Sequence, residues 1–107
     1  MKPTAALHAL GQSLWLDNIT RTLLDDGTLA RYIREDSITG LTSNPSIFDA
    51  AIGSGAYDAD IHASALDGLS GEALFIDLAL NDLRRAADLF RPVFDASDRL
   101  DGWVSME

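Results

Sequence analysis

The chain has 107 residues, 47% of them hydrophobic, which is enough for one modest core but not for two domains. Its formal net charge of −9 argues against a nucleic-acid partner, because affinity for nucleic acid comes mainly from Lys and Arg side chains. The absence of Cys excludes disulfides, thiolate metal sites and a Cys nucleophile. No apolar stretch has the length of a membrane helix or a signal peptide. We therefore expect a cytoplasmic protein with no membrane partner.

Residues 13–18, "SLWLDN", form a short apolar run that ends on an acid and an amide, which predicts a buried strand. Residues 20–36 follow with apolar side chains at mainly helical intervals. Thr20 is the expected N-cap, and the sequence Asp-Asp-Gly at 25–27 predicts a break between two helical pieces.

The next apolar run, residues 37–43, is a second predicted strand that turns abruptly into small polar side chains. Pro45 suits the first turn of a helix, where its missing N–H costs nothing, so Asn44 is expected at or beside the N-cap. Glycines at 53 and 55 interrupt the helical sequence that follows, which reaches about Leu66.

The clearest helical pattern covers residues 70–94. We expect Pro92 to end or kink this helix near Phe90 or Arg91, because proline cannot donate a helical hydrogen bond. The expected apolar stripe consists of Ile76, Leu80, Leu83, Ala87, Phe90 and Phe94.

A third strand is predicted in residues 101–107, around Trp103 and Val104. Strands that alternate with helical stretches imply parallel pairing through right-handed crossovers. Two architectures accept this order, a doubly wound open sheet and a β/α barrel. The sequence after the first predicted strand has no glycine-rich dinucleotide-binding turn, which favours the barrel.

Each predicted strand is followed by a polar residue capable of chemistry: Asp17, Asn44 and Glu107. In a β/α barrel the active site lies at the carboxyl ends of the strands. Taken singly, each residue has an ordinary structural explanation, as a turn residue, a helix cap or a solvated acid. Their coincidence at three strand ends favours a common site.

No metal site is predicted. His8 and His62 have no second ligand three or four residues away, as a zinc site on a helix would require. The acidic segment 95–107 has the wrong spacing for a calcium loop. Arg84 and Arg85 are expected on the solvated face of their helix.

The blocks "SLWLDNITR", "GLTSNPSIF" and "DGWVSME" together resemble the first, second and third strands of transaldolases, over essentially the whole chain. The resemblance implies an incomplete (β/α)8 TIM-type barrel, with three parallel strands and connecting helices. It also implies an enzyme of the pentose phosphate pathway that transfers a dihydroxyacetone unit from sedoheptulose 7-phosphate to glyceraldehyde 3-phosphate. No cofactor is expected, because in this family a lysine forms a Schiff base with the ketose.

The resemblance also implies roles for the three residues at the strand ends. By their positions in the matching motifs, Asp17 is the acid/base that handles the sugar hydroxyl proton during carbon–carbon cleavage. Glu107 relays protons through a water, and Asn44 hydrogen-bonds the bound three-carbon unit.

The sequence departs from the family in one large respect. The Schiff-base lysine belongs to the fourth strand, and the single lysine here, Lys2, precedes the first strand. We therefore expect residues 1–107 to be the N-terminal portion of a single barrel domain, inactive alone and able to self-associate through its open edge. The alternatives are a related small sugar-phosphate aldolase, a transaldolase fused to a sugar-phosphate isomerase, and a non-catalytic, helix-rich interaction module.

Overall fold

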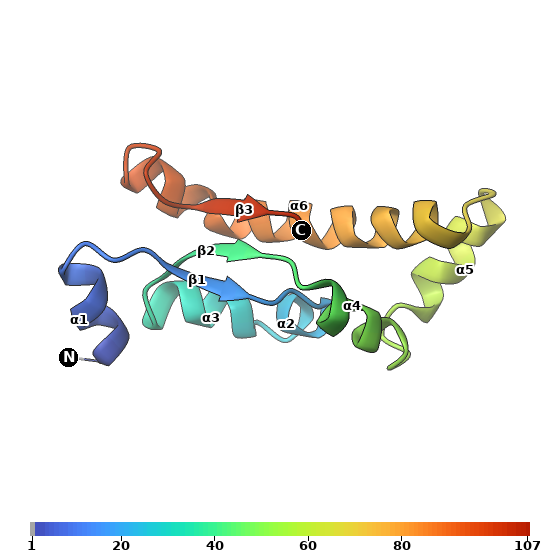
Figure 1. The fold of residues 1–107 in the computed structure, drawn as a ribbon, viewed down its shortest axis with the longest axis horizontal. Coiled ribbons are helices and arrows are strands. Elements are labelled where there is room, and N and C mark those ends of the chain that lie inside the picture. The colour runs from blue at the N-terminus through green and yellow to red at the C-terminus, as the bar shows by residue number, and fades with distance from the viewer. Residues whose placement is uncertain (1) are drawn as a thin grey trace.

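The fold is a three-stranded parallel sheet with connecting helices, seen in a computed structural model that describes residues 2–107 (Figure 1). The strands β1 (Leu14–Asp17), β2 (Ile38–Thr42) and β3 (Trp103–Ser105) lie side by side in the order of the sequence. Each strand falls inside one of the three predicted segments, so the prediction of an α/β fold with parallel strands is confirmed. The arrangement is that of a partial TIM-type barrel.

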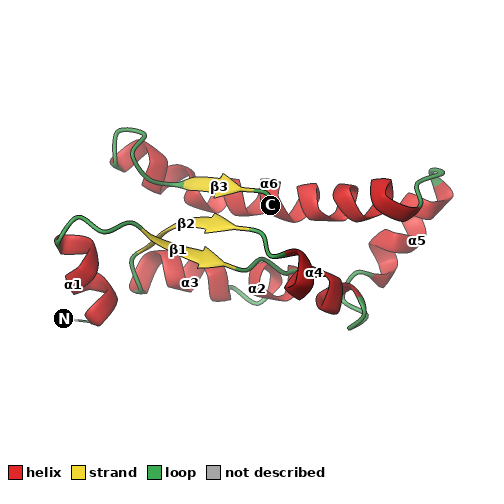
Figure 2. Ribbon diagram, viewed as in Figure 1, coloured by secondary structure: helices red, strands yellow, loops and turns green. Residues whose placement is uncertain are grey.

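The principal helices cover one face of the sheet, and in Figure 2 the three strands lie in front of α2, α3 and α6. The far end of α6 and all of α5 extend beyond the carboxyl ends of the strands (Figure 1). Within residues 2–107, no helix is both long enough and apolar enough to cross a membrane. The helices are α1 (Pro3–Ala9), α2 (Arg21–Asp25), α3 (Thr28–Glu35), α4 (Pro45–Ile52), α5 (Asp58–Leu66) and α6 (Gly71–Ala96).

The predicted break between the first two crossover helices is confirmed. Thr20 caps α2, and its Oγ1 accepts a hydrogen bond from the Leu23 N–H at 3.4 Å. Gly27 has a φ of +80°, a left-handed conformation that glycine adopts without a steric penalty. Gly27 is the N-cap of α3, and Asp26 Oδ1 accepts a hydrogen bond from the N–H of Thr28, the first residue of α3, at 2.9 Å.

We expected Pro92 to end or kink α6 near Phe90 or Arg91; it does not end the helix, which continues to Ala96. The missing proline N–H removes the hydrogen bond to the carbonyl of Asp88, one turn earlier. Asp88 and Pro92 are both exposed, so water can satisfy that carbonyl. The helix therefore tolerates a proline here that would break it on its buried face.

The predicted apolar stripe of α6 was only partly right. Leu83 and Phe90 are buried, but Ile76 is 37% exposed and Ala87 is also exposed. Apolar side chains occupy more of the surface of α6 than packs against the rest of the chain. The periodicity of the sequence does not show which of these side chains are buried. The buried positions of α6 are Leu78, Ala79, Asp82, Leu83, Ala86 and Phe90.

The main core lies between the sheet and the helices behind it. Leu16, Leu41 and Val104 project from the three strands into this core, where they meet Leu83 and Phe90 of α6. A second core, beyond the carboxyl ends of the strands, gathers α4, α5 and the first half of α6 around Phe48, Tyr57, Leu78 and Ala79. Together the two cores support the carboxyl ends of the strands: the main core packs against the covered face of the sheet, and the second core lies beyond the strand ends.

The other face of the sheet is the more open one, and there Trp103 has an edge-on contact with Phe94 of α6, with 5.5 Å between ring centroids. Trp15, Gly40 and Trp103 are cross-strand neighbours on this face, and the two indoles are 44% and 53% exposed. A Cβ at Gly40 would lie 2.4 Å from Trp15 Cε2, so the indole packs directly on the glycine backbone. In a TIM barrel this face lines the barrel interior.

Candidate active site

The structure places all three predicted site residues at the carboxyl edge of the sheet. Asp17 is the last residue of β1 and is the register partner of Thr42, which in turn is the register partner of Ser105. Asn44 and Glu107 each follow two residues after the end of their strand, so they lie in the loops rather than in the strands. Parallel strands bring these three loops to one edge.

Asn44 is the N-cap of α4, and its Oδ1 accepts a hydrogen bond from the Ile47 N–H at 3.2 Å. This confirms the expected cap. Within residues 2–107 the amide nitrogen of Asn44 donates no hydrogen bond, so a bound molecule could receive one from it. One side chain can thus serve both as a cap and as a ligand.

Ser43 positions the loop of Glu107, which the sequence patterns did not reveal. Ser43 is buried, its N–H donates to the carbonyl of Ser105 at 3.0 Å, and its Oγ accepts from the N–H of Glu107 at 2.8 Å. These two bonds continue the pairing of β2 and β3 past the last regular strand residue. The sequence feature that could have identified Ser43 is its position as a small polar residue between Thr42 and Asn44, at the carboxyl end of β2.

Asp17 projects from the open face, and the two residues after it lead into the protein interior. Ile19 is 1% exposed and belongs to the main core. Asn18 Oδ1 is buried and has no hydrogen-bond partner among residues 2–107. A buried acceptor without a partner is costly, so Asn18 is a second polar group of this loop that a ligand or water could satisfy.

A buried ionic cluster lies behind the loop that follows β1. Asp82 is 0% exposed, and its Oδ1 accepts from Arg21 Nε at 2.8 Å while its Oδ2 accepts from the Tyr57 hydroxyl. Arg21 also pairs with Asp60, and its guanidinium carbon lies 4.6 Å from the centre of the Tyr57 ring. The sequence patterns did not identify Asp82, because periodicity did not show that its side of α6 is buried, where an acid requires a partner.

The charge states within this cluster follow from its contacts. Burial raises the pKa of Tyr57, and the hydrogen bond to Asp82 raises it further. Burial lowers the pKa of Arg21, but the hydrogen bonds to Asp82 and Asp60 outweigh this and leave it raised. At neutral pH the cluster therefore holds a neutral tyrosine and a charged arginine.

Lys2 lies far from the strand ends that carry the candidate site. Its Nζ is 3.0 Å from Asp36 Oδ1, and Asp36 comes just before β2 begins. The amino ends of parallel strands lie at the edge opposite to their carboxyl ends. In the part of the chain that the structure describes, no group of three His, Asp or Glu side chains could hold a metal ion.

Comparison with known proteins identifies the family. The family described as Transaldolase/Fructose-6-phosphate aldolase matches residues 14–107. The chain belongs to this family. Curated relatives include Transaldolase 2 of Nostoc punctiforme, 47% identical over 98 residues, and the transaldolase of Thiobacillus denitrificans, 44% identical over 108 residues. A third is the transaldolase of Mycolicibacterium smegmatis, 43% identical over 104 residues.

These alignments cover 91%, 100% and 96% of this chain but 26%, 30% and 28% of the respective relatives. The chain therefore spans less than a third of the length of the transaldolases that it matches. In this chain, Asp17, Asn44 and Glu107 lie at the edge of the sheet where a β/α barrel carries its active site.

Proposed function

We propose that this chain supplies the first three strands and part of the active site of a transaldolase. The reaction transfers a dihydroxyacetone unit from sedoheptulose 7-phosphate to glyceraldehyde 3-phosphate through a Schiff-base lysine. The observation that carries the proposal is the placement of Asp17, Asn44 and Glu107 at one edge of the sheet, in a chain of this family.

Asp17 is the proposed general acid/base. Its carboxyl group is exposed on the open face at the last residue of β1, while Leu16 before it packs against the core and Ile19 after it is buried. Cleavage of the ketose needs an acceptor for the sugar hydroxyl proton, and the new bond to the acceptor aldehyde needs that proton returned. One fixed carboxyl group performs both steps in turn.

Asn44 and Glu107 are the proposed supporting residues. The Asn44 amide nitrogen donates to the bound three-carbon unit, while its oxygen keeps the cap of α4. Glu107, held through its N–H by Ser43, relays protons through a water during formation and hydrolysis of the Schiff base. No metal or organic cofactor enters the proposal, because the protonated Schiff base accepts the electrons of the broken bond.

The nucleophilic lysine of the proposal lies on the next strand of the barrel, beyond residue 107. Lys2 is the single lysine of this chain, and its ion pair with Asp36 holds it at the amino edge of the sheet. We therefore expect the 107-residue chain to have no transaldolase activity alone. Formation of erythrose 4-phosphate by the purified chain, with contaminating enzyme excluded, would contradict this expectation.

A chimaera tests the proposed role of Asp17. Residues 1–107 replace the matching part of Nostoc punctiforme Transaldolase 2, and erythrose 4-phosphate formation is measured. We expect an active chimaera whose kcat falls by about 100-fold or more with Asp17→Asn, since general acid–base catalysis contributes factors of this size. Asp88→Asn, which removes an exposed carboxylate from α6, is the matched control and should leave kcat unchanged. An active chimaera indifferent to Asp17→Asn would exclude the role.

A further inference from the structure

The segments that follow β1 and β2 both contact Tyr57, a residue of the connection between α4 and α5. Arg21, four residues after Asp17, donates its backbone N–H to the Tyr57 hydroxyl at 2.7 Å. Phe48, four residues after Asn44, packs edge-on against the Tyr57 ring with 5.3 Å between centroids. Tyr57 is 0% exposed, so it is enclosed between the segments that carry two of the candidate site residues.

On the polar side, Tyr57 completes a closed ring of hydrogen bonds. Arg21 begins α2, where the first backbone N–H groups have no partner within the helix. The Tyr57 hydroxyl accepts from this N–H and donates to Asp82 Oδ2, while Asp82 Oδ1 accepts from Arg21 Nε. The first residue of α2 is thus held through both its backbone and its side chain.

On the apolar side, Tyr57 and Phe75 hold the first turn of α4. The Phe48 ring lies between them, edge-on to both, with its centroid 5.0 Å from that of Phe75. Phe48 also donates its N–H to the Asn44 carbonyl at 2.9 Å, which connects its buried ring to the capping residue. Aromatic pairs of this geometry contribute beyond their buried area.

We propose that Tyr57 is a positioning residue, which sets the placement of Asp17 and Asn44 relative to one another through Arg21 and Phe48. It touches neither the proposed substrate nor the reacting atoms. The catalytic use of this placement rests on the proposed transaldolase function, but the placement itself can be tested without any activity. Misplacement of catalytic groups by about 1 Å lowers the rate strongly, so a fixed spacing between Asp17 and Asn44 favours catalysis.

Nuclear magnetic resonance of the 107-residue chain provides the direct test. Tyr57→Phe keeps the ring on Phe48 but removes the hydroxyl. The matched control is Tyr32→Phe, because within residues 2–107 the hydroxyl of Tyr32 makes no side-chain hydrogen bond. We expect Tyr57→Phe to shift the Asp17 carboxyl and Asn44 amide resonances, and to speed exchange of the Arg21 amide about two- to tenfold, as loss of one hydrogen bond predicts.

The proposal is overturned if Tyr57→Phe moves these resonances no more than Tyr32→Phe does, or if all amides exchange faster by the same factor. A uniform change would mean that Tyr57 only stabilises the fold. Asp82→Asn is the second variant. It keeps the side-chain volume but removes the charge that orients Arg21, and it should shift the same Asp17 resonance.

The chimaera described above provides a second measurement if the isolated variants do not fold. There Tyr57→Phe should lower kcat about tenfold with less than a twofold change in KM, because substrate contacts are retained. An unchanged kcat would count against positioning. An inactive chimaera with the original residues, together with shifted Asp17 resonances in the isolated chain, would refute the proposed function alone.

Discussion

At the scale of single residues, the cluster behind the β1 loop combines groups that the sequence keeps far apart. Arg21, Tyr57 and Asp82 come from α2, the connection before α5, and the middle of α6. A buried carboxylate is stable only when charge and hydrogen bonds compensate its desolvation, and here both oxygens of Asp82 have a partner. Removing the side chain of Tyr57 or of Asp82 leaves each of the other two residues with one hydrogen-bond partner fewer.

The raised pKa of Tyr57 predicts that the chain loses stability at high pH. The folded state holds the tyrosine proton more tightly than the unfolded state, whose pKa is near 10.0. The stability that Tyr57 contributes is therefore fully present below about pH 10. It falls as the pH rises above this value, because the unfolded chain releases the tyrosine proton first. The limiting slope for one proton is about 1.4 kcal/mol per pH unit.

Urea unfolding between about pH 9 and pH 11.5 measures this effect. Tyr57→Phe should reduce the slope, because it removes the proton that the folded state holds more tightly. Equal slopes for the unmodified chain and Tyr57→Phe would show that the folded protein does not hold this proton.

At the scale of elements, Pro92 gives α6 a local defect that the fold does not require. A proline within a helix costs about 3 kcal/mol relative to alanine, and Pro92 is exposed on a helix that continues past it. We expect Pro92→Ala to raise the free energy of unfolding by about 1–3 kcal/mol. Thermal unfolding followed by circular dichroism checks this.

Pro45→Ala is the matched control for this substitution. Pro45 occupies the first turn of α4, where a proline N–H would have no partner in any case. We expect no gain from Pro45→Ala, and a loss of a few tenths of a kcal/mol through the more flexible unfolded chain. A gain as large as that from Pro92→Ala would contradict the explanation by helix position.

Elements with local causes were predictable from the sequence. Thr20 and Asn44 were identified as caps because capping depends on residues within one turn, and the Gly27 break depends on one backbone conformation. The buried face of α6 was not predictable, because both sides of the helix carry apolar residues. Asp82 and Ser43 were missed because their partners lie 61 and 64 residues away in the chain.

At the scale of the whole molecule, the chain exposes more surface than a compact protein of its size. Its radius of gyration is 15.1 Å, against about 13 Å expected for this length. Its accessible surface is 6418 Å², against about 5,800 Å² expected for this mass. The open face of the sheet contributes to this surface, because the indoles of Trp15 and Trp103 remain about half exposed there.

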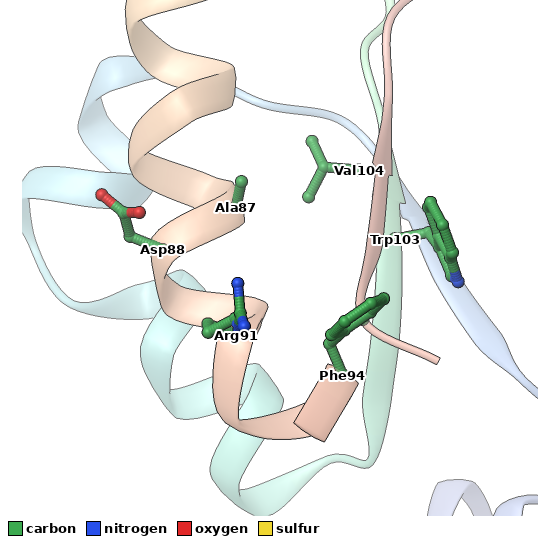
Figure 3. A pocket seen from close by; sticks show the side chains of 7 residues that line it. Ala87, Asp88, Arg91, Phe94, Trp103 and Val104 are labelled. Atoms are coloured by element: carbon green, nitrogen blue, oxygen red, sulfur yellow. The ribbon is translucent and has the colours of Figure 1, made fainter. Parts of the chain in front are cut away.

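The outer edge of β3 is part of the same open region. In the part of the chain that the structure describes, β3 pairs with β2 on one side and with no strand on the other. A pocket lies beside this edge, between β3 and α6, and Figure 3 shows Val104 directed towards α6 while Trp103 projects from the opposite side of the strand. An unpaired edge next to apolar side chains favours pairing with another chain.

We therefore predict that the isolated chain self-associates through the β3 edge, and that added salt strengthens the association by screening the net charge of −9 on each copy. Sedimentation velocity over a range of protein and salt concentrations measures this. Ser105→Lys places a charge on the open face of β3 and should weaken association, as lysines on edge strands do. Ser46→Lys adds the same charge on exposed α4 and should not.

The association state and the thermal transition of the isolated chain distinguish a barrel fragment with an open edge from a self-contained interaction module. A monomer at every concentration, with one sharp thermal transition, would contradict the prediction and would favour a self-contained interaction module. Association that Ser105→Lys weakens and Ser46→Lys does not would locate the contact at the β3 edge. Equal strengthening by both variants would point instead to general charge repulsion, since each substitution makes the net charge of −9 less negative by the same amount.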